Sequence, residues 1–393
     1  MTWQISRRSL LRGSAAAAGA GLLQACAGTP AGQNAAQMRP QPQPQPKPRQ
    51  PKTSGNNVLR IIASSGFAPE PARAQAGINL LQYAGFAVTN QEAAFRRFQR
   101  FAGSDAERIA DVQDVATGHA ATPKVLMGMR GGYGAHRLLP HIDFASLGAR
   151  MREHGTLFFG FSDVCALQLA LLAQGGWLSF AGPMVYSEFG KPVPSSYTMD
   201  SFIRCTTTPD YTVSVPAMQR RDLHIEGMLW GGNLSVLSAL AGSPYMPDIK
   251  GGILFIEDVG EQPYRIERML QTLLLAGVLQ KQQAVVLGDF RMGSIRDVYD
   301  SSYDLSAVTA AVSRAAKIPV LTGFPFGHIA DKTTFPLGAH AQIRSDGNGG
   351  YTVAFSGYPT LDKNSLSLDN LMPQTAFDTG ITQSVIEEKT DSE

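Results

Sequence analysis

The chain has 393 residues, with 34 basic and 32 acidic side chains and a formal net charge of +2. This length allows two domains with substantial cores, and 44% hydrophobic with 17% charged residues excludes a largely disordered protein. The small net charge argues against a nucleic-acid binder, and three cysteines exclude a disulfide-rich scaffold.

Residues 1–25 have the features of a cleavable export signal. Arg7, Arg8 and Arg12 stand before an Ala- and Gly-rich run that extends to Leu23, and the segment has no acidic residue. The run is too short to span a bilayer, and the paired arginines are typical of leaders that use the twin-arginine (Tat) route. A basic N-terminal arm is the alternative interpretation.

A lipidation site is predicted directly after this leader. The sequence Leu23-Gln24-Ala25-Cys26 resembles a lipoprotein processing box, in which Cys26 becomes the first mature residue and carries acyl chains. Two or more acyl chains hold a protein firmly on a membrane surface. Ala27 after the cysteine favours the outer membrane if enterobacterial sorting rules apply. The sequence thus predicts a periplasmic, lipid-anchored protein; a cysteine without function is the alternative.

Residues 26–55 are predicted to form an extended stalk. Six of the twelve residues from Pro40 to Pro51 are proline, which favours a polyproline-like chain without a core; a neutral spacer is the alternative. Seven of the 34 basic residues and none of the 32 acidic ones precede residue 56. Residues 56–393 therefore have 27 basic and 32 acidic side chains, a net charge of −5, which strengthens the case against nucleic acid.

An N-terminal α/β domain is predicted over residues 56–200. Buried strands are expected at 58–62, 86–89, 125–129 and 157–159, and helices at 69–81 and after a capping box that begins at Ser104. Strands that alternate with helices indicate a parallel sheet covered on both faces, a three-layer Rossmann-like arrangement.

A mixed α/β domain is predicted over residues 215–375, after a polar crossing at 196–222 and before a flexible acidic tail at 376–393. Its expected strands are 253–256, 284–287 and 319–321, its helix is 264–279, and a hairpin turn at 346–350 joins strands 341–344 and 351–355.

Ser162 is the leading candidate for a nucleophile. The apolar run 157–159 leads through Gly160 and Phe161 to this serine, and an apolar helix is expected after it. The pattern resembles a nucleophile elbow, in which a serine lies on a sharp strand-to-helix turn, although Val164 replaces the second glycine of that motif. A helix-capping serine is the alternative.

Gly131, Gly132 and Gly134 follow the third predicted strand. Glycines at a strand end let backbone N–H groups approach a ligand, so this segment is a candidate for half of an oxyanion hole. A dinucleotide loop would need a third glycine farther along, which the chain lacks, and a plain tight turn is the alternative.

The hydroxyl needs a base and an acid that orients it. Candidate bases are the histidines that follow the expected strands, namely His136, His141, His154 and His328. Glu257 and Asp258 end the strand 253–256, where sites in α/β folds gather; a carboxylate that starts a helix is the alternative.

Five segments in order are similar to those of the LD-carboxypeptidase family (peptidase family S66), over about residues 57–375. They are Arg130–Gly134, Gly160–Asp163, Gly231–Ser235, Ile253–Leu270 and Gly327-His328. The resemblance implies a Ser-Glu-His triad shared by two domains, with the active site between them.

The resemblance assigns roles to individual residues. Ser162 would be the nucleophile, His328 the base and Glu257 the acid that orients the imidazole. The backbone N–H groups of Asp163 and of Gly131 or Gly132 would form the oxyanion hole.

Substrate contacts are expected from Tyr133, Asn233 and Arg265. Because the substrate has a free carboxylate, Arg265 and Arg268 are its candidate partners, although exposed helix arginines without such a role are equally common. Cys165 is expected to be a core residue, and its pairing with Cys205 stays open.

The resemblance implies removal of the terminal D-Ala from peptidoglycan tetrapeptides, at the diaminopimelate–D-Ala amide. It implies no metal and no cofactor, stem peptides as partners and a homodimer. A lipid-anchored solute-binding protein without catalysis is one alternative. A peptidase of the microcin-resistance type, which cleaves a peptide–nucleotide conjugate, is another; the export signal argues against it because that chemistry is needed in the cytoplasm.

Overall fold

A computed structural model describes residues 57–216 and 222–373. The leader, the lipidation site at Cys26, the stalk and the acidic tail lie outside the described residues. Within the described ranges, no helix is both long and apolar enough to cross a membrane.

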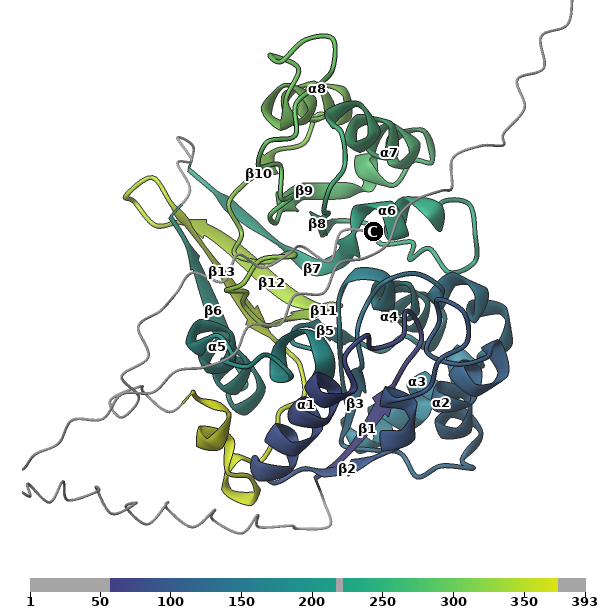
Figure 1. Cartoon of the computed structure of the whole chain (residues 1–393). Helices are drawn as coiled ribbons and strands as arrows, with labels where there is room; N and C mark the ends of the chain where they lie inside the picture. The colour runs from purple at the N-terminus through teal and green to yellow at the C-terminus, as the bar shows by residue number, and fades with distance from the viewer. Residues whose placement is uncertain (1–56, 217–221, 374–393) are drawn as a thin grey trace, which may run out of the picture. The chain divides into compact units, whose positions relative to one another are not determined.

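The first sheet has six strands in the order β11-β5-β4-β3-β1-β2 (Figure 1). The strands are β1 (Val58–Ile62), β2 (Ala87–Thr89), β3 (Val125–Gly128), β4 (Leu157–Gly160), β5 (Ser179–Ala181) and β11 (Phe335–Leu337). Strands β1 to β5 are parallel to their neighbours, whereas β11 is antiparallel to β5. The predicted parallel, Rossmann-like sheet is confirmed.

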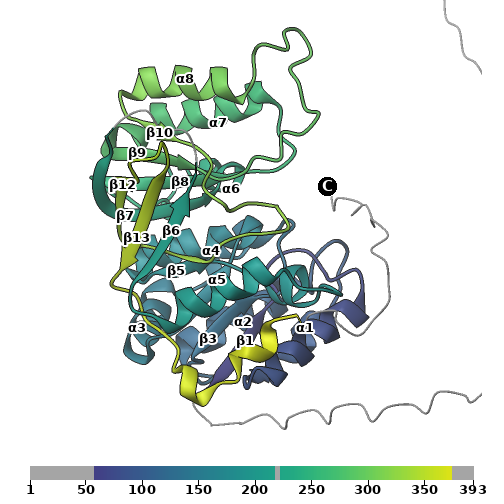
Figure 2. The same cartoon turned by 90° about the vertical axis from the view of Figure 1, so that its left-hand side faces the viewer.

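Helices cover both faces of this sheet. They are α1 (Pro71–Tyr83), α2 (Asp105–Thr117), α3 (Phe144–His154), α4 (Cys165–Ala170) and α5 (Ser196–Thr207). Figures 1 and 2 show α2 and α3 on one face and α1 and α5 on the other. The capping box is confirmed: Ser104 accepts from the Glu107 amide, and the Glu107 carboxylate accepts from the Ser104 amide.

The second sheet is mixed and has the order β10-β9-β8-β7-β12-β13-β6. Its strands are β6 (Tyr211–Val215), β7 (His224–Asn233), β8 (Gly252–Glu257), β9 (Gln282–Leu287), β10 (Val320–Leu321), β12 (Ala339–Ser345) and β13 (Tyr351–Ser356). Strands β7 to β10 are parallel, and β12 and β13 form the predicted hairpin. Its helices are α6 (Leu234–Ala239), α7 (Pro263–Leu275) and α8 (Leu305–Ala316).

The prediction of an irregular crossing at 196–222 is wrong for residues 196–207, which form α5, and for residues 211–215, which form β6. Polar residues at both ends of α5 hid a buried stripe of Met199, Phe202 and Cys205 at helical spacing. Strand β6 alternates buried and exposed residues over only five positions, so it pairs with β13 despite its polar composition.

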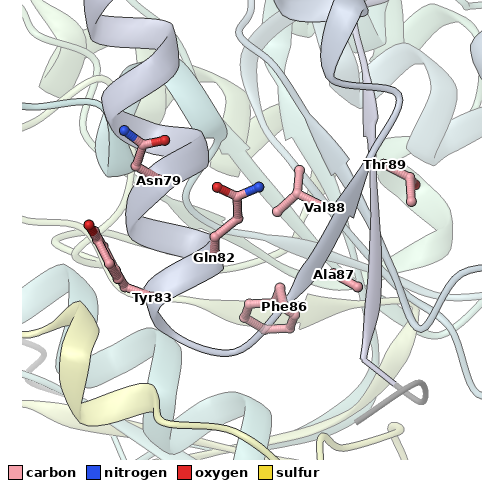
Figure 3. A pocket seen from close by; sticks show the side chains of 7 residues that line it. All are labelled: Asn79, Gln82, Tyr83, Phe86, Ala87, Val88 and Thr89. Atoms are coloured by element: carbon pink, nitrogen blue, oxygen red, sulfur yellow. The ribbon is translucent and has the colours of Figure 1, made fainter. Parts of the chain in front are cut away.

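A pocket of about 460 Å³ lies between α1 and β2 and is lined by Asn79, Gln82, Tyr83 and residues 86–89 (Figure 3). None of its lining residues is a predicted site residue. The candidate site lies instead where β3 and β4 of the first sheet and β8 of the second end, as expected for parallel strands.

Candidate active site

Ser162 lies on a sharp turn between β4 and α4. The turn is the single 3₁₀ turn η4 (Ser162–Val164), and the backbone of Ser162 has φ of 58°, in the left-handed region. A residue other than glycine costs roughly 1–3 kcal/mol in such a conformation, which persists only where the surroundings enforce it. The strained turn projects the hydroxyl from the sheet edge, as in a nucleophile elbow.

Val164 replaces the second glycine of the elbow motif, and two other glycines make room for it. A Cβ atom on Gly160 would lie 2.5 Å from Cγ1 of Val164, and one on Gly128 would lie 3.2 Å from Cγ2. The valine thus fills space that β3 and β4 leave open, and the tight turn forms without the motif's second glycine.

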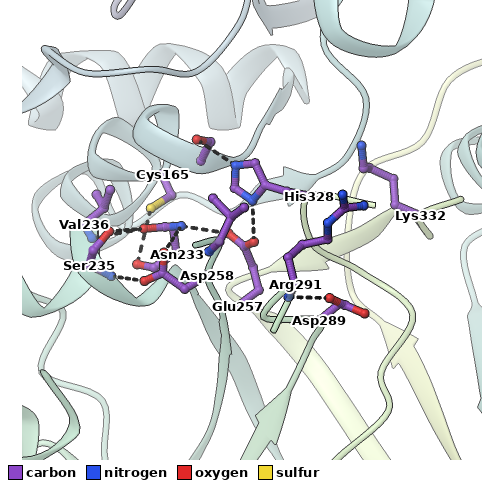
Figure 4. Close-up of polar contacts among 12 residues, drawn as sticks. Cys165, Asn233, Ser235, Val236, Glu257, Asp258, Asp289, Arg291, His328 and Lys332 are labelled. Atoms are coloured by element: carbon purple, nitrogen blue, oxygen red, sulfur yellow. Dashed lines mark hydrogen bonds and ion pairs between the residues drawn. The ribbon is translucent and has the colours of Figure 1, made fainter. Parts of the chain in front are cut away.

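His328 joins Ser162 to Glu257. Figure 4 shows the ring of His328 directed at the Glu257 carboxylate. Its Nε2 atom lies 3.1 Å from the Ser162 hydroxyl, and its Nδ1 atom lies 2.9 Å from Oε2 of Glu257. Glu257 ends β8 and is 1% exposed, whereas the His328 side chain is 24% exposed. This chain of bonds has the geometry of a catalytic triad, in which the acid orients the imidazole and the imidazole takes the proton of the hydroxyl.

Asn233 connects the triad to a second carboxylate. Its Nδ2 atom donates to Oε1 of Glu257 at 3.2 Å and to Oδ1 of Asp258 at 3.3 Å, while its Oδ1 atom caps α6 by accepting from the Val236 amide. Burial and then the charge of Glu257 raise the pKa of Asp258 to about 6. The Asn233 amide group therefore binds the carboxylates of both Glu257 and Asp258.

The pKa of His328 is raised above its ordinary value of 6.5. Burial alone lowers this pKa, but the charge of Glu257 and its hydrogen bond outweigh burial, and Asp258 adds to the increase. The charge of Lys332 acts in the opposite direction.

We expect kcat/KM to fall as the pH drops through a value above 6.5, because protonated His328 cannot accept the serine proton. Initial rates between pH 5 and 9 measure this acidic limb. The variant Asp258→Asn should move the limb to lower pH, since it removes a charge that raises the pKa of His328. A wild-type limb below 6.5 would contradict this electrostatic account.

Gly131 lies directly against the nucleophile. A Cβ atom at this position would lie 2.6 Å from the Ser162 hydroxyl and 3.6 Å from the Asp163 amide nitrogen. The Asp163 carboxylate faces away, since it accepts from the Ser65 hydroxyl at 2.6 Å and from the Ala135 amide at 2.8 Å. The backbone of Asp163 and the loop from Gly131 to Gly132 thus border the space beside the serine hydroxyl.

The variant Gly131→Ala should lower kcat/KM by roughly 10²-fold or more, because the new methyl group displaces the nucleophile or the oxyanion donors. Gly66→Ala is the matched control. Its Cβ atom would lie 3.3 Å from the Gly131 carbonyl oxygen, so the same loop is touched without contact to Ser162. Equal activity in the two variants would show that this loop does not shape the reacting space.

The structure reveals an ion pair that sequence reasoning missed. Lys332 Nζ lies 2.5 Å from Oε1 of Glu188, and both side chains are buried. The ammonium also lies 4.7 Å from the centroid of the Phe161 ring, which contacts the His328 ring edge-on at 5.3 Å. The ion pair therefore fastens the loop that carries His328 to residues 185–189, and the contact with Phe161 joins it to the segment that leads to Ser162. No local pattern could have revealed it, because the partners are 144 positions apart.

Comparisons with known proteins agree with this geometry. Residues 59–182 match the model of the LD-carboxypeptidase N-terminal domain, and residues 226–343 match that of the C-terminal domain. A probable murein peptide carboxypeptidase of Bacillus subtilis is 30% identical over 70% of this chain and 86% of its own length. The chain belongs to the LD-carboxypeptidase family. It is thus a serine carboxypeptidase by family.

Two further family members are similar to this chain. The crystal structure of muramoyltetrapeptide carboxypeptidase from Oxalobacter formigenes is 40% identical, with a TM-score of 0.70 over 77% of this chain and 100% of that one. The microcin C7 self-immunity protein of Escherichia coli is 29% identical over 69% of this chain and 85% of its own length. Proteins whose names denote different functions thus share the family.

Tyr133 and Arg265, two further residues that were expected to contact substrate, both lie at the surface. Tyr133 is exposed beside the glycine loop, and its ring contacts Phe101 and the Arg100 guanidinium. Arg265 lies on the exposed face of α7, with its guanidinium 3.7 Å from the Glu261 carboxylate. Cys26 lies outside the described residues.

Two of the remaining candidate bases, His136 and His154, contact backbone carbonyl groups instead of the serine. Nε2 of His136 lies 3.3 Å from the Val236 carbonyl oxygen, and Nδ1 of His154 lies 3.0 Å from the Arg150 carbonyl oxygen. Of the histidines that the sequence proposed, only His328 contacts Ser162 in the described part of the chain. Within the described ranges, no group of three or more His, Cys, Asp or Glu side chains is placed to hold a metal ion.

Cys165 and Cys205 are both free and buried. Burial raises the pKa of each thiol, so neither is poised to react as a thiolate. The interpretation of Cys165 as a small core residue agrees with its place in the hydrophobic cluster.

Proposed function

We propose that this protein is a serine LD-carboxypeptidase that removes the terminal D-Ala from peptidoglycan tetrapeptides through an acyl-enzyme. The observation that supports it most is the unbroken chain of bonds from Ser162 through His328 to Glu257, built on a strained turn. The names of the Bacillus and Oxalobacter relatives support the choice of murein peptides as substrates.

In the proposed mechanism, the Ser162 hydroxyl attacks the carbonyl carbon of the diaminopimelate–D-Ala amide while its proton passes to Nε2 of His328. The backbone N–H groups of Asp163 and of Gly131 or Gly132 stabilise the resulting oxyanion. His328 returns the proton to the amine, and D-Ala leaves. Water, deprotonated by His328, then hydrolyses the acyl-enzyme and frees the tripeptide and Ser162.

The experiment that tests this proposal is mass spectrometry of products from defined substrates. Disaccharide-tetrapeptide should yield disaccharide-tripeptide and free D-Ala, whereas a peptidyl–nucleotide conjugate should be cleaved far more slowly. Faster cleavage of the conjugate would favour the activity suggested by the name of the Escherichia coli relative. Binding of tetrapeptide without any product would favour a solute-binding protein.

We also propose export through the Tat route, lipid anchoring at Cys26, action in the periplasm and a homodimeric state. The paired arginines, the cysteine after the leader and the proline-rich stalk support the first three, and the family resemblance supports the dimer. Fractionation should find the wild-type protein in the outer membrane and Cys26→Ala outside the membrane fraction. Light scattering should give twice the chain mass.

A further inference from the structure

The proposed substrate ends in a free carboxylate, which a carboxypeptidase must recognise but an endopeptidase must not require. Arg265, the residue expected to bind it, lies beside Glu261 on α7 and has no contact with the triad within the described ranges. The first of the family-like segments, Arg130–Gly134, begins with another arginine.

Arg130 follows β3 and precedes Gly131, the residue that touches the nucleophile. Its Nη1 atom donates to the Phe67 carbonyl oxygen at 2.8 Å, and the neighbouring Gly66 amide donates to the Gly131 carbonyl oxygen at 3.1 Å. The two loops are thereby fastened together, and the Arg130 side chain is held against the 66–67 loop, one residue before the glycine that lies against Ser162.

A series of contacts through Tyr186, Glu188 and Lys332, called the wall below, connects Arg130 to the loop of His328. The Tyr186 amide donates to the Met129 carbonyl oxygen at 2.9 Å, and the Tyr186 ring centroid lies 5.7 Å from Cζ of Arg130. Two residues farther along, Glu188 pairs with Lys332, which follows His328 closely in the chain. Because His328 must protonate the leaving amine, we expect the leaving residue and its carboxylate on the side of the site that these contacts connect to His328.

Arg130 has the capacity to bind an anion. Its side chain is half-buried, and a guanidinium has five N–H donors, of which the hydrogen bond to Phe67 uses one. In the described part of the chain Arg130 forms no ion pair. The two acids that contact this wall have other partners: Glu70 accepts from the Tyr186 hydroxyl at 3.2 Å, and Glu188 pairs with Lys332. Lys332, by contrast, is already neutralised by Glu188.

We propose that Arg130 binds the terminal carboxylate of the leaving D-residue and thereby restricts cleavage to chain ends. This inference rests on the proposed function. Planar, charge-assisted bonds between a guanidinium and a carboxylate are strong and directional, so they would also align the scissile amide with Ser162.

The test compares a tetrapeptide that ends in D-Ala with the same peptide ending in D-alaninamide. Wild-type protein should prefer the free acid, and Arg130→Met should lower kcat/KM for it by about 10²-fold while leaving the amide nearly unchanged. Arg97→Met is the matched control, because Arg97 stacks on Phe67 at 4.1 Å without bordering the glycine loop, and it should keep the wild-type preference.

Arg291→Met tests a rival cation. Arg291 is exposed, its backbone has φ of 51°, and its side chain extends toward the side of the site that holds His328 and Lys332 (Figure 4). Loss of the acid preference in this variant but not in Arg130→Met would overturn the assignment. Equal loss for both peptides in Arg130→Met would also overturn it, since Arg130 would then only support the loop.

Calorimetry separates this inference from the proposed function. Inactive Ser162→Ala protein should bind the free acid more tightly than the amide, and the added Arg130→Met should abolish that difference. If the wild-type protein releases no D-Ala but this binding pattern holds, the proposed reaction is wrong and the carboxylate site stands. If turnover occurs without any dependence on Arg130, the reaction stands and the carboxylate site is wrong.

Discussion

Ser162→Ala should lower the rate of D-Ala release by about 10⁴–10⁶-fold, because the nucleophile of a triad contributes most of its catalytic power. Within the described ranges, the one hydrogen bond of the hydroxyl is to His328, so the fold should be unaffected. Chromatographic assay of D-Ala together with thermal unfolding measures both effects. Ser146→Ala, at a partly exposed serine on α3 whose hydroxyl donates to Asp143, is the control and should keep full activity.

Ser162→Gly sharpens this test. Glycine adopts a φ of 58° without steric cost, so this variant should be inactive yet at least as stable as the wild-type protein. A gain of stability with loss of activity would show that the strained backbone serves catalysis. Substantial D-Ala release by either variant would mean that Ser162 is not the nucleophile.

Glu257→Gln should lower kcat by about 10⁴-fold, as expected when the wrong imidazole tautomer is stabilised. The hydrogen bonds of Asn233 determine how the new amide group is oriented. Its Nδ2 atom donates to Oε1 of Glu257, and it cannot turn over without losing the bonds that its Oδ1 atom accepts from Ser235 and Val236. The new amide must therefore point its oxygen at Asn233 and its NH₂ group at His328. Nδ1 of His328 then accepts a hydrogen bond from this amide, and the ring proton moves to Nε2. Protonated Nε2 cannot take the proton of the Ser162 hydroxyl.

Glu257→Asp is the control for this prediction. Aspartate keeps the negative charge and can only accept hydrogen bonds, so it cannot stabilise the wrong tautomer of His328 and should lose far less activity than the isosteric amide. Steady-state kinetics and thermal unfolding of both variants give the comparison. If Glu257→Gln is as active as Glu257→Asp, the orientation of His328 by this acid has no catalytic importance.

The sequence predicted much of the fold from local patterns. Strands β3 and β4 of the first sheet are continuous apolar runs, and a glycine-rich turn joins β12 to β13, so these elements could be recognised over short windows. Strand β11 could not, because its three residues cross from the C-terminal half to pair with β5. Such pairing depends on tertiary contacts that no local window contains.

The candidate site likewise has one part that local sequence patterns predict and another that depends on tertiary contacts. The turn at Ser162 follows from its neighbours in sequence, whereas the choice of His328 among the candidate histidines came from family resemblance. The geometry agrees with that choice, since its ring nitrogens lie beside Ser162 and Glu257. Asn233 was expected to bind substrate, but its amide holds the two buried acids, a contact that only the pairing of β7 with β8 reveals.

Trapping the acyl-enzyme tests the central claim most directly. A tetrapeptide analogue with D-lactate in place of D-Ala replaces the scissile amide by an ester, so that acylation outruns hydrolysis of the intermediate. Intact-protein mass spectrometry after rapid quenching should find the mass of the tripeptide acyl group added to the chain and mapped to Ser162, with a burst of D-lactate. Hydrolysis at the same rate in Ser162→Ala, or an adduct on another residue, would contradict the account.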